Sequence, residues 1–340
     1  MKRVTIKDVA RVAGVSYATV SRALSGSPEI GEETRQRIIQ ISKEMGYTPN
    51  SIARSLVIQS TKIFGLIVGR INNPFMSEIA YYVEKHARDQ GYNLMLCNSG
   101  SDLDHEEETY RLLVGRQVDG IIIIPAGADS YERLKPHLGA TPTVFMSENL
   151  KDLRESYVTV DNYKGTMLGV DYLYSLGHRN ILYFGRRLGS LTHQLRAEGY
   201  EDACKRYGLT PAFVDSHYTH SSIKKGYALA AELFRTREHL KYTAIMASTD
   251  TMALGIIKAA DEFGLRIPQD FSLVGFDNIN FSSLPKINLT TIDQPKKAMA
   301  AAAVDMLIHK INDPTIGYSH RIMEPTLIVR DSCAPLQNNP

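Results

Sequence analysis

Apolar residues follow two patterns along the chain, and the change between them comes near Ile63. Before that point they recur at three- and four-residue spacing, which is typical of short amphipathic helices. After it, short β-branched runs alternate with longer stretches of helical spacing, which predicts parallel sheets built from strand–helix–strand units. The chain is therefore expected to have a small all-helical head and a larger α/β body.

The first two predicted helices are short and joined by a tight turn. Thr5 can cap the first helix, and Asp8 is placed to reach back to it as in a capping box. Gly14 stands where this helix would end in a left-handed conformation, and Ser16 can cap the next one. Two braced helices at this spacing form a helix-turn-helix.

The second helix would bury one face against its partners and present the other. The inward positions are Val20, Ala23 and Leu24. An aromatic, a small residue and an arginine on the outward face suit insertion into the DNA major groove. The residues expected to contact DNA are Thr5, Ser16, Tyr17, Ala18, Thr19, Ser21 and Arg22.

A third helix from Glu32 to Met45 completes the head, and a linker follows it. Asn50 can cap a helix over 51–57, which is so short that it would be marginal in water without a partner. Two interpretations remain open from the residues alone. The segment is either a hinge helix that folds on DNA or a plain linker whose Leu56 packs on the body.

The body is predicted to contain at least nine strands and seven helices. The strands are expected at 63–68, 93–97, 120–124, 143–146, 158–160, 181–184, 244–247, 272–276 and 289–292. The helices are expected at 74–90, 106–116, 162–176, 195–207, 224–236, 251–263 and 296–311. Two similar halves, roughly 61–160 and 162–290, each hold several of these units.

Charge is distributed unevenly between head and body. Residues 1–60 hold nine Lys or Arg against five acids, a net charge of +4, whereas the whole chain is only +2 and the remainder is therefore −2. A basic head on a mildly acidic body is expected when one small domain neutralises phosphates. This asymmetry favours nucleic acid as the partner of the head.

Several classes of protein are disfavoured by what the sequence lacks. No run of eighteen apolar residues and no signal-peptide core occur, so a cytoplasmic protein is expected. The three cysteines, Cys97, Cys204 and Cys333, fit neither a disulfide framework nor a metal site. No His-x-x-x-His pair, Gly-x-Ser-x-Gly elbow or Gly-x-x-x-x-Gly-Lys loop is present, which argues against an enzyme and predicts no cofactor.

Motifs along nearly the whole chain resemble those of the lactose-galactose repressor family. The head carries TIKDVARVAGVSYATVSRALSG, ETRQRI, GYTPN and SIARSL. The body carries GLIVGRINNPF, QVDGIIIIP, SLGHRNILYFG, STDTMALGIIKAADEFGLRIPQDFSLVGFDN and EPTLIVRDSC. The resemblance implies a helix-turn-helix head and a two-lobed body of two doubly wound parallel sheets, like a periplasmic sugar-binding protein.

The resemblance also implies boundaries and a role for the linker. The expected domains are a head at 1–49, a hinge at 50–60, a first lobe at 61–160 plus 292–322, and a second lobe at 161–291 plus 323–340. The hinge would order on operator DNA beside that of a second copy. Leu56 then matches an apolar wedge in the minor groove, with Asn50 and Ala53 as its neighbours.

An effector would bind between the lobes, at the carboxyl ends of the strands. The polar and aromatic residues expected there are Asn73, Phe75, Ser147, Asp161, Arg196, Tyr218, Thr249, Asp250, Asp277 and Gln294. Arg196 and Asp277 match the effector-binding arginine and aspartate of the family. For Asp161 and Asp250, helix N-capping is an equally good interpretation.

The predicted function is a homodimeric transcriptional repressor that binds a pseudo-palindromic operator and is switched by a carbohydrate effector. Two alternatives remain. The family also contains catabolite-control regulators that use a phosphorylated carrier protein as corepressor, and Thr249 with the stretch 98–100 resembles those members. A sugar-acting enzyme would explain the body alone and leave the basic head unexplained.

Overall fold

A computed structural model of the chain describes residues 4–48, 60–139, 141–147, 154–187, 189–218 and 220–336. Two compact units are present, a head within residues 1–61 and a body from Lys62 onward. Among the described residues, no helix is both long and apolar enough to cross a membrane.

The head consists of three helices around a small apolar core. They are α1 (Ile6–Ala13), α2 (Tyr17–Leu24) and α3 (Glu32–Glu44). Val9, Val20 and Ile38, one from each helix, are fully buried against one another. The predicted caps form: Asp8 accepts hydrogen bonds from the backbone and hydroxyl of Thr5, at 3.0 and 2.7 Å. Gly14 ends α1 in the left-handed conformation, so the turn forms as expected.

The first lobe of the body is a parallel sheet in the order β11-β5-β4-β3-β1-β2. Its strands are β1 (Ile63–Val68), β2 (Asn93–Asn98), β3 (Gly120–Ile123), β4 (Thr143–Met146), β5 (Ser156–Val160) and β11 (His320–Met323). Its helices are α5 (Pro74–Asp89), α6 (Leu103–Gly115), α7 (Ser130–Leu134), the short turn η1 (Lys135–His137) and α12 (Lys296–Asn312).

The second lobe repeats this design in the order β12-β10-β9-β8-β6-β7, with only β12 antiparallel to its neighbour. Its strands are β6 (Ile181–Arg186), β7 (Phe213–Asp215), β8 (Ala244–Ala247), β9 (Ser272–Asp277), β10 (Thr290–Asp293) and β12 (Thr326–Ile328). Its helices are α8 (Asn162–Ser175), α9 (Leu191–Arg206), α10 (Ile223–Arg235) and α11 (Asp250–Glu262), with turns η2 (Glu238–Lys241) and η3 (Asn280–Ser283).

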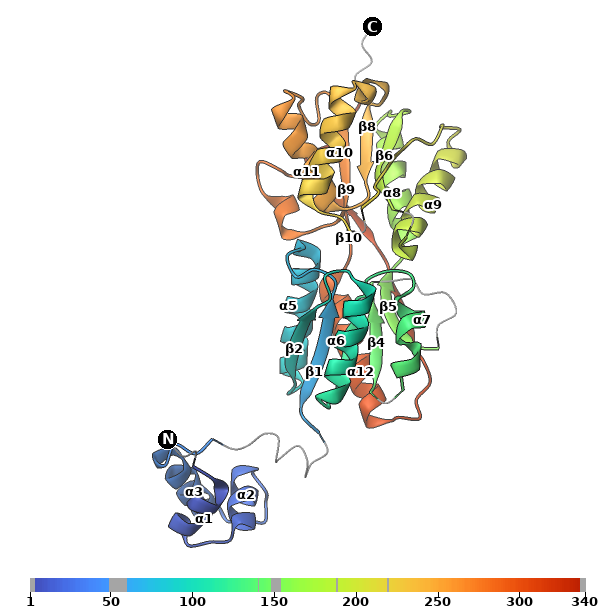
Figure 1. Cartoon of the computed structure of the whole chain (residues 1–340). Helices are drawn as coiled ribbons and strands as arrows, with labels where there is room; N and C mark the ends of the chain where they lie inside the picture. The colour runs from blue at the N-terminus through green and yellow to red at the C-terminus, as the bar shows by residue number, and fades with distance from the viewer. Residues whose placement is uncertain are drawn as a thin grey trace. The chain divides into compact units, whose positions relative to one another are not determined.

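Both sheets are covered by helices on both faces, as Figure 1 shows. Successive strand residues point to opposite faces, which explains the continuous apolar runs. In β1, Phe64 and Leu66 pack under α5 and α12, whereas Ile67 packs under α6 and α7. In the second lobe, α10 and α11 cover one face and α8 and α9 the other. The helical head and the two-lobed α/β body predicted from sequence are confirmed.

The chain passes between the lobes three times. It does so at Asp161, at 294–295 and at 324–325, between the last strand of one sheet and the next element of the other lobe. The boundary expected after 291 falls inside β10, and the one expected after 322 falls inside β11.

The sequence does not predict strands β7, β11 and β12 or helix α7, because each is only three to five residues long and has no clear period.

Helices α10 and α11 pack closely at two glycines, which gives a test of this packing. A Cβ at Gly255 of α11 would fall on the backbone of Gly226 and Tyr227 in α10. Gly255→Ala is therefore expected to destabilise the body by about 3 kcal/mol, because backbone cannot yield as a side chain does. Gly115, at the end of α6, has open space around it. Gly115→Ala is expected to stabilise by about 0.5 kcal/mol.

Thermal unfolding of the full chain checks both changes. Equal melting midpoints for Gly255→Ala and wild type would contradict the close α10–α11 contact.

Candidate functional site

The outward face of α2 presents the predicted DNA-contacting residues to solvent. Ser16 caps the helix by accepting a hydrogen bond from the Thr19 amide at 3.1 Å. The Tyr17 side chain is 64% exposed, and Ser21 and Arg22 are exposed beside it. Arg22 contacts the exposed carboxylate of Glu29 at 3.2 Å. A surface pair of this kind is weak, so a DNA phosphate or the acceptor edge of a base can displace it.

Two further residues of the predicted DNA face, Thr5 and Ala18, also lie in the described head. Thr5 is exposed at the start of α1, and Ala18 is half-buried in the first turn of α2. The predicted hinge residues Asn50, Ala53 and Leu56 lie outside the described residues.

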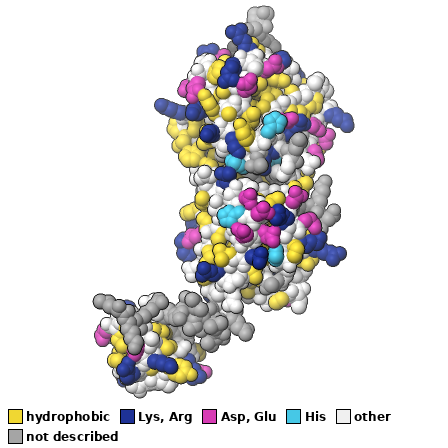
Figure 2. Space-filling model, in the orientation of Figure 1, with side chains coloured by type: hydrophobic (Ala, Val, Ile, Leu, Met, Phe, Trp, Pro, Cys, Tyr) yellow, Lys and Arg dark blue, Asp and Glu magenta, His cyan; other side chains and the backbone are white. Residues whose placement is uncertain are grey.

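A cavity of about 110 Å³ lies between the lobes of the body. It is lined at the carboxyl ends of strands from both sheets, by Arg70 after β1, Ser147 after β4 and Arg187 after β6 among others. In the view of Figure 2, Lys, Arg and His side chains lie along the edge of the second lobe that faces the first lobe. The lobes also meet directly here, because the Thr192 hydroxyl donates to the Ser147 carbonyl at 2.9 Å.

Seven of the ten predicted effector-binding residues line this cavity. They are Asn73, Phe75, Ser147, Arg196, Thr249, Asp277 and Gln294. Asn73 and Thr249 also cap α5 and α11, accepting hydrogen bonds from the Phe75 and Met252 amides at 3.0 and 3.2 Å. Capping and cavity lining therefore coincide at these two positions.

The other three predicted residues lie outside the cavity lining. Asp161 caps α8, accepting a hydrogen bond from the Lys164 amide at 2.9 Å. Asp250 is fully buried and is not a cap, since Thr249 takes that position. Its carboxylate instead accepts hydrogen bonds from the Ile279 amide and from the hydroxyls of Ser282 and Thr291. Tyr218 is 37% exposed and lies under the Lys225 ammonium group at 4.7 Å.

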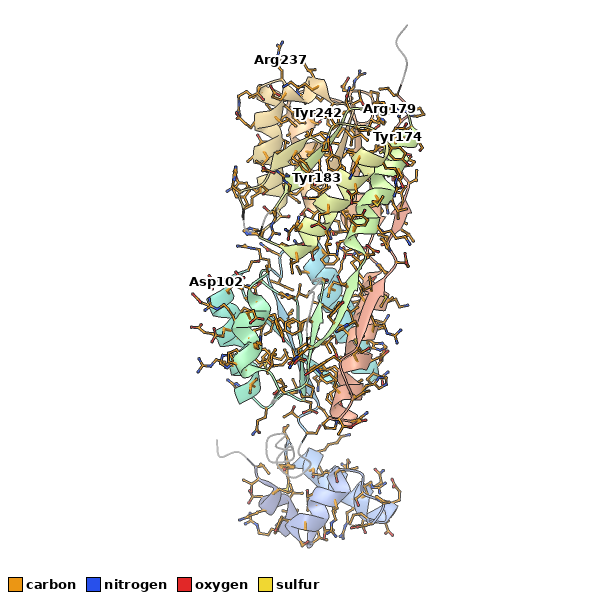
Figure 3. The ribbon with its side chains drawn as sticks, turned by 90° about the vertical axis from the view of Figure 1, so that its right-hand side faces the viewer. Asp102, Tyr174, Arg179, Tyr183, Arg237 and Tyr242 are labelled. Atoms are coloured by element: carbon orange, nitrogen blue, oxygen red, sulfur yellow. The ribbon has the colours of Figure 1, made fainter. Side chains whose placement is uncertain are left out.

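Arg196 is the most constrained cation of the cavity. Its side chain comes from the second turn of α9 and is only 3% exposed. Nε donates to the Asn162 side chain at 2.8 Å, and Nη1 donates to the Ser248 carbonyl at 2.7 Å. The guanidinium carbon lies over the Phe276 ring, 3.6 Å from the ring centroid. Tyr183 of β6 lies in the apolar interior of the same lobe (Figure 3).

Asp277, at the end of β9, is the counterion of Arg196. The two side chains approach to 3.5 Å, and Asp277 is 5% exposed. Burial raises the pKa of Asp277, which the positive charge of Arg196 partly offsets. The Gln294 amide donates to the Asp277 carboxylate at 2.6 Å, and Lys296 donates to its backbone carbonyl at 2.7 Å. A charged donor and an acceptor thus stand side by side at the cavity wall.

The sequence reasoning missed four cationic or titratable residues of the lining, namely Arg70, Arg187, His193 and His220. The rule that found Ser147 and Asp277, a polar residue just past a strand, also applies to Arg70 and Arg187. His193 lies three residues before Arg196, on the same face of α9. His220 precedes α10, and nothing in the spacing of polar and apolar residues predicts that it lies at the cavity.

Several polar atoms of the lining are buried and have no hydrogen-bond partner among the described residues. They are Ser147 Oγ, Ser221 Oγ, His193 Nδ1 and Arg70 Nε. Buried polar atoms are usually satisfied, so unsatisfied ones gathered at one cavity indicate a site for a polar ligand. Among the described residues, no cluster of His, Cys, Asp and Glu could hold a metal ion.

Comparison with known protein families identifies both parts of the chain. Residues 5–50 match the family described as bacterial regulatory proteins, lacI family. Residues 170–333 match a periplasmic binding protein-like domain.

Relatives and a solved structure match almost the entire length. The ribose operon repressor of Haemophilus influenzae is 32% identical over 336 residues, which cover 98% of this chain and 99% of the relative. Catabolite control protein A of Priestia megaterium is 34% identical, over 94% of this chain and 97% of its own length. A crystal structure of the lac repressor dimer bound to operator and the anti-inducer ONPF has a TM-score of 0.87 at 26% identity, covering 98% of this chain and 100% of that one. The chain therefore belongs to the lacI family and is a DNA-binding transcriptional regulator.

Proposed function

We propose that this regulator is a repressor whose affinity for its operator is set by a small polyhydroxyl effector bound between the lobes of the body. The observation that carries the proposal is the cavity at the strand ends of both sheets, with Arg196 and Asp277 at its wall. The Arg196–Asp277 pair indicates what kind of ligand binds, and the two-lobed body indicates how a bound ligand changes operator affinity.

A sugar or sugar derivative fits the lining. Arg196 offers donors and Asp277 an acceptor, which together suit vicinal hydroxyls. Phe75, buried to 6% exposure, supplies an apolar wall for a ring face. A volume of about 110 Å³ is several times the roughly 10–15 Å³ that admits one water, so the cavity has room for a small polar ligand. The relative from Haemophilus influenzae is named for an operon of such a sugar, ribose.

The switch is a change in the arrangement of the lobes. The head is joined covalently to the first lobe, since β1 is the first element after Lys62. A ligand that contacts both lobes stabilises one arrangement relative to others, and typical coupling between two sites is about 1–3 kcal/mol. The effector can therefore change operator affinity without contacting DNA.

The repressor acts as a homodimer. Exposed apolar side chains lie on or next to α5, the sheet-edge strand β2, α10 and η3. They are Ile71, Tyr81, Leu96, Ile223, Phe281 and Leu284. The two lobes contact each other between α5 and η3, where the Asn280 amide donates to Glu78 at 2.8 Å. An apolar surface of this kind is typical of a protein interface, and the lac repressor of similar structure is a dimer.

A small effector accounts for the body better than the alternatives. The cavity has buried polar atoms with no partner among the described residues, which a small ligand can satisfy and a carrier protein docked elsewhere cannot. The buried acids are also unsuited to hydrolysis, because Asp250 and Asp277 are engaged by internal donors. A repressor without enzymatic activity, working in the cytoplasm where its operator lies, is the function we infer.

Arg22 tests the DNA-contacting face. Arg22→Ala is expected to weaken binding to an operator selected from random DNA by about 1–3 kcal/mol, because a guanine edge would lose a bidentate partner. Binding to unrelated DNA should change little. Fluorescence anisotropy on both duplexes measures the difference, and sedimentation of the complex should give two chains per operator.

Glu29→Gln is the matched control, since it removes the partner of Arg22 in the free head. It should leave operator affinity unchanged or slightly stronger. An equal loss by Arg22→Ala on both duplexes would make Arg22 a phosphate contact and nothing more.

Arg196 tests the cavity and the charge balance within it. Arg196→Ala should abolish binding of sugars that shift the melting temperature of the wild type. It should also destabilise the body by up to about 3–5 kcal/mol, because Asp277 is left as an uncompensated buried charge.

The destabilisation should depend on pH in a defined direction. Burial raises the pKa of Asp277 to about 7, so above about pH 4 the native state binds more protons than the unfolded chain and stability falls as pH rises toward 7. Without the positive charge of Arg196 the pKa of Asp277 rises further, so the stability of the variant keeps falling as the pH rises above 7. The deficit of the variant relative to wild type, measured by thermal unfolding, should be larger at about pH 8.5 than at about pH 6. A deficit independent of pH would contradict the charge pairing.

A further inference from the structure

We propose that the effector carries a negative charge, which is held between Arg70 of the first lobe and Arg187, His220 and Lys225 of the second. This inference rests on the proposed function and specifies its ligand, a monosaccharide-sized polyol bearing a phosphate or a carboxylate. The hydroxyl groups occupy the Arg196–Asp277 end of the cavity, and the anionic group occupies the end nearer Arg70.

The lining holds more cations than anions. Among the described residues that line the cavity, three are arginines, Arg70, Arg187 and Arg196, and Asp277 is the single acid. Asp277 lies 3.5 Å from Arg196 and accepts a hydrogen bond from Gln294. Its negative charge is therefore paired with Arg196, at one end of the cavity. The described lining therefore holds more positively than negatively charged side chains, and an anionic ligand complements such a surface better than a neutral sugar does.

A second cation reaches the same end through His220. The Lys225 ammonium lies 2.8 Å from Nε2 of His220, which itself lines the cavity. Burial, followed by the positive charges of Lys225, Arg70 and Arg187, lowers the pKa of His220 to about 4. Burial and the same two arginines also lower the pKa of Lys225. Groups from both lobes are thus close enough to act on one another electrostatically.

Backbone dipoles add to this positive field. Helix α9 begins at the cavity with Ser190, Thr192 and His193 in the lining, and α10 begins just after Ser221. The amino-terminal end of a helix favours a bound anion.

Two buried polar side chains point to a ligand at these helix ends independently of the charges. His193 is 6% exposed and Ser221 is 8% exposed, and both line the cavity. Within the described part of the chain, Nδ1 of His193 and Oγ of Ser221 have no hydrogen-bond partner. A phosphate or carboxylate offers several acceptor oxygens, so it can satisfy donors from both helix ends at once.

The arrangement also explains how such a ligand would act on the lobes. Arg70 belongs to the first lobe and Arg187 to the second, and both line the cavity. Lys225 of the second lobe lies within electrostatic reach of both arginines. An anion bound among these groups attracts cations of both lobes and so holds the lobes together. A neutral sugar provides no such attraction at this end.

The direct test compares matched ligands by isothermal titration of the full chain. The probes are ribose, ribonate and ribose 5-phosphate, glucose, gluconate and glucose 6-phosphate, and inorganic phosphate. At least one anionic member should bind about tenfold or more tightly than its neutral parent, and its affinity should fall as salt is raised. Inorganic phosphate should bind more weakly than that ester, because it lacks the hydroxyls for Arg196 and Asp277.

Variants assign the effect to the cations. Arg70→Gln and Arg187→Gln should each reduce affinity for the anionic ligand about tenfold and leave affinity for its neutral parent nearly unchanged. Arg88→Gln is the matched control, an exposed arginine of α5 paired with Glu84 on the same helix. It should change neither affinity. The anionic ligand should also change the operator affinity of wild type, and this response should be lost in Arg70→Gln.

The outcomes separate this inference from the function on which it rests. Neutral sugars that bind as tightly as their anionic derivatives, and that change operator affinity, would overturn the charge assignment and leave the proposed function standing. Equal affinities of wild type and Arg70→Gln for the anionic ligand would also overturn it. Binding by no member of the panel would count against the polyhydroxyl effector, and so against the proposed function and this inference together.

Discussion

A buried guanidinium organises the second lobe. Arg196 extends from α9 to the side chain of Asn162 at the start of α8, to the carbonyl of Ser248 after β8, and to Phe276 and Asp277 at the end of β9. Four elements are therefore held in register by one side chain. Because a charge removed from water is costly unless it is paired and fully hydrogen-bonded, these elements must keep their places while Arg196 stays charged. The same constraint gives the cavity a rigid wall on which a ligand can be oriented.

Two aspartates of this lobe have similar places in the sequence but different roles. Asp250 follows β8 and Asp277 ends β9, so both were expected in the cavity. The structure brings only Asp277 to its surface. Asp250 faces β10 and η3, where three donors hold its carboxylate. The strand-end rule places a residue near the correct edge of the sheet, but the direction of its side chain depends on helix packing that the sequence does not reveal.

Much of the architecture could be predicted because it depends on periodicity. The long helices and the buried strands have strong periods, and the caps at Thr5, Ser16 and Asn73 have clear chemistry. Strands β7, β11 and β12 are too short for a period, and the edge strand β11 is mostly exposed. The cationic lining was missed for another reason. In the sequence, Arg70 and Arg187 cannot be told from ordinary surface arginines, because only the folding of the two sheets places both at one cavity.

The central claim is that the arrangement of the lobes sets operator affinity, and it can be measured without any ligand. Ser147 and Thr192 are joined by a hydrogen bond across the cavity, so cysteines at both positions can be bridged by a short or a long thiol-reactive linker. Operator affinity, measured by fluorescence anisotropy against both single-cysteine controls, should differ between the two linkers by roughly 5- to 150-fold. Equal affinities for the short-linked, long-linked and unlinked proteins would contradict the account.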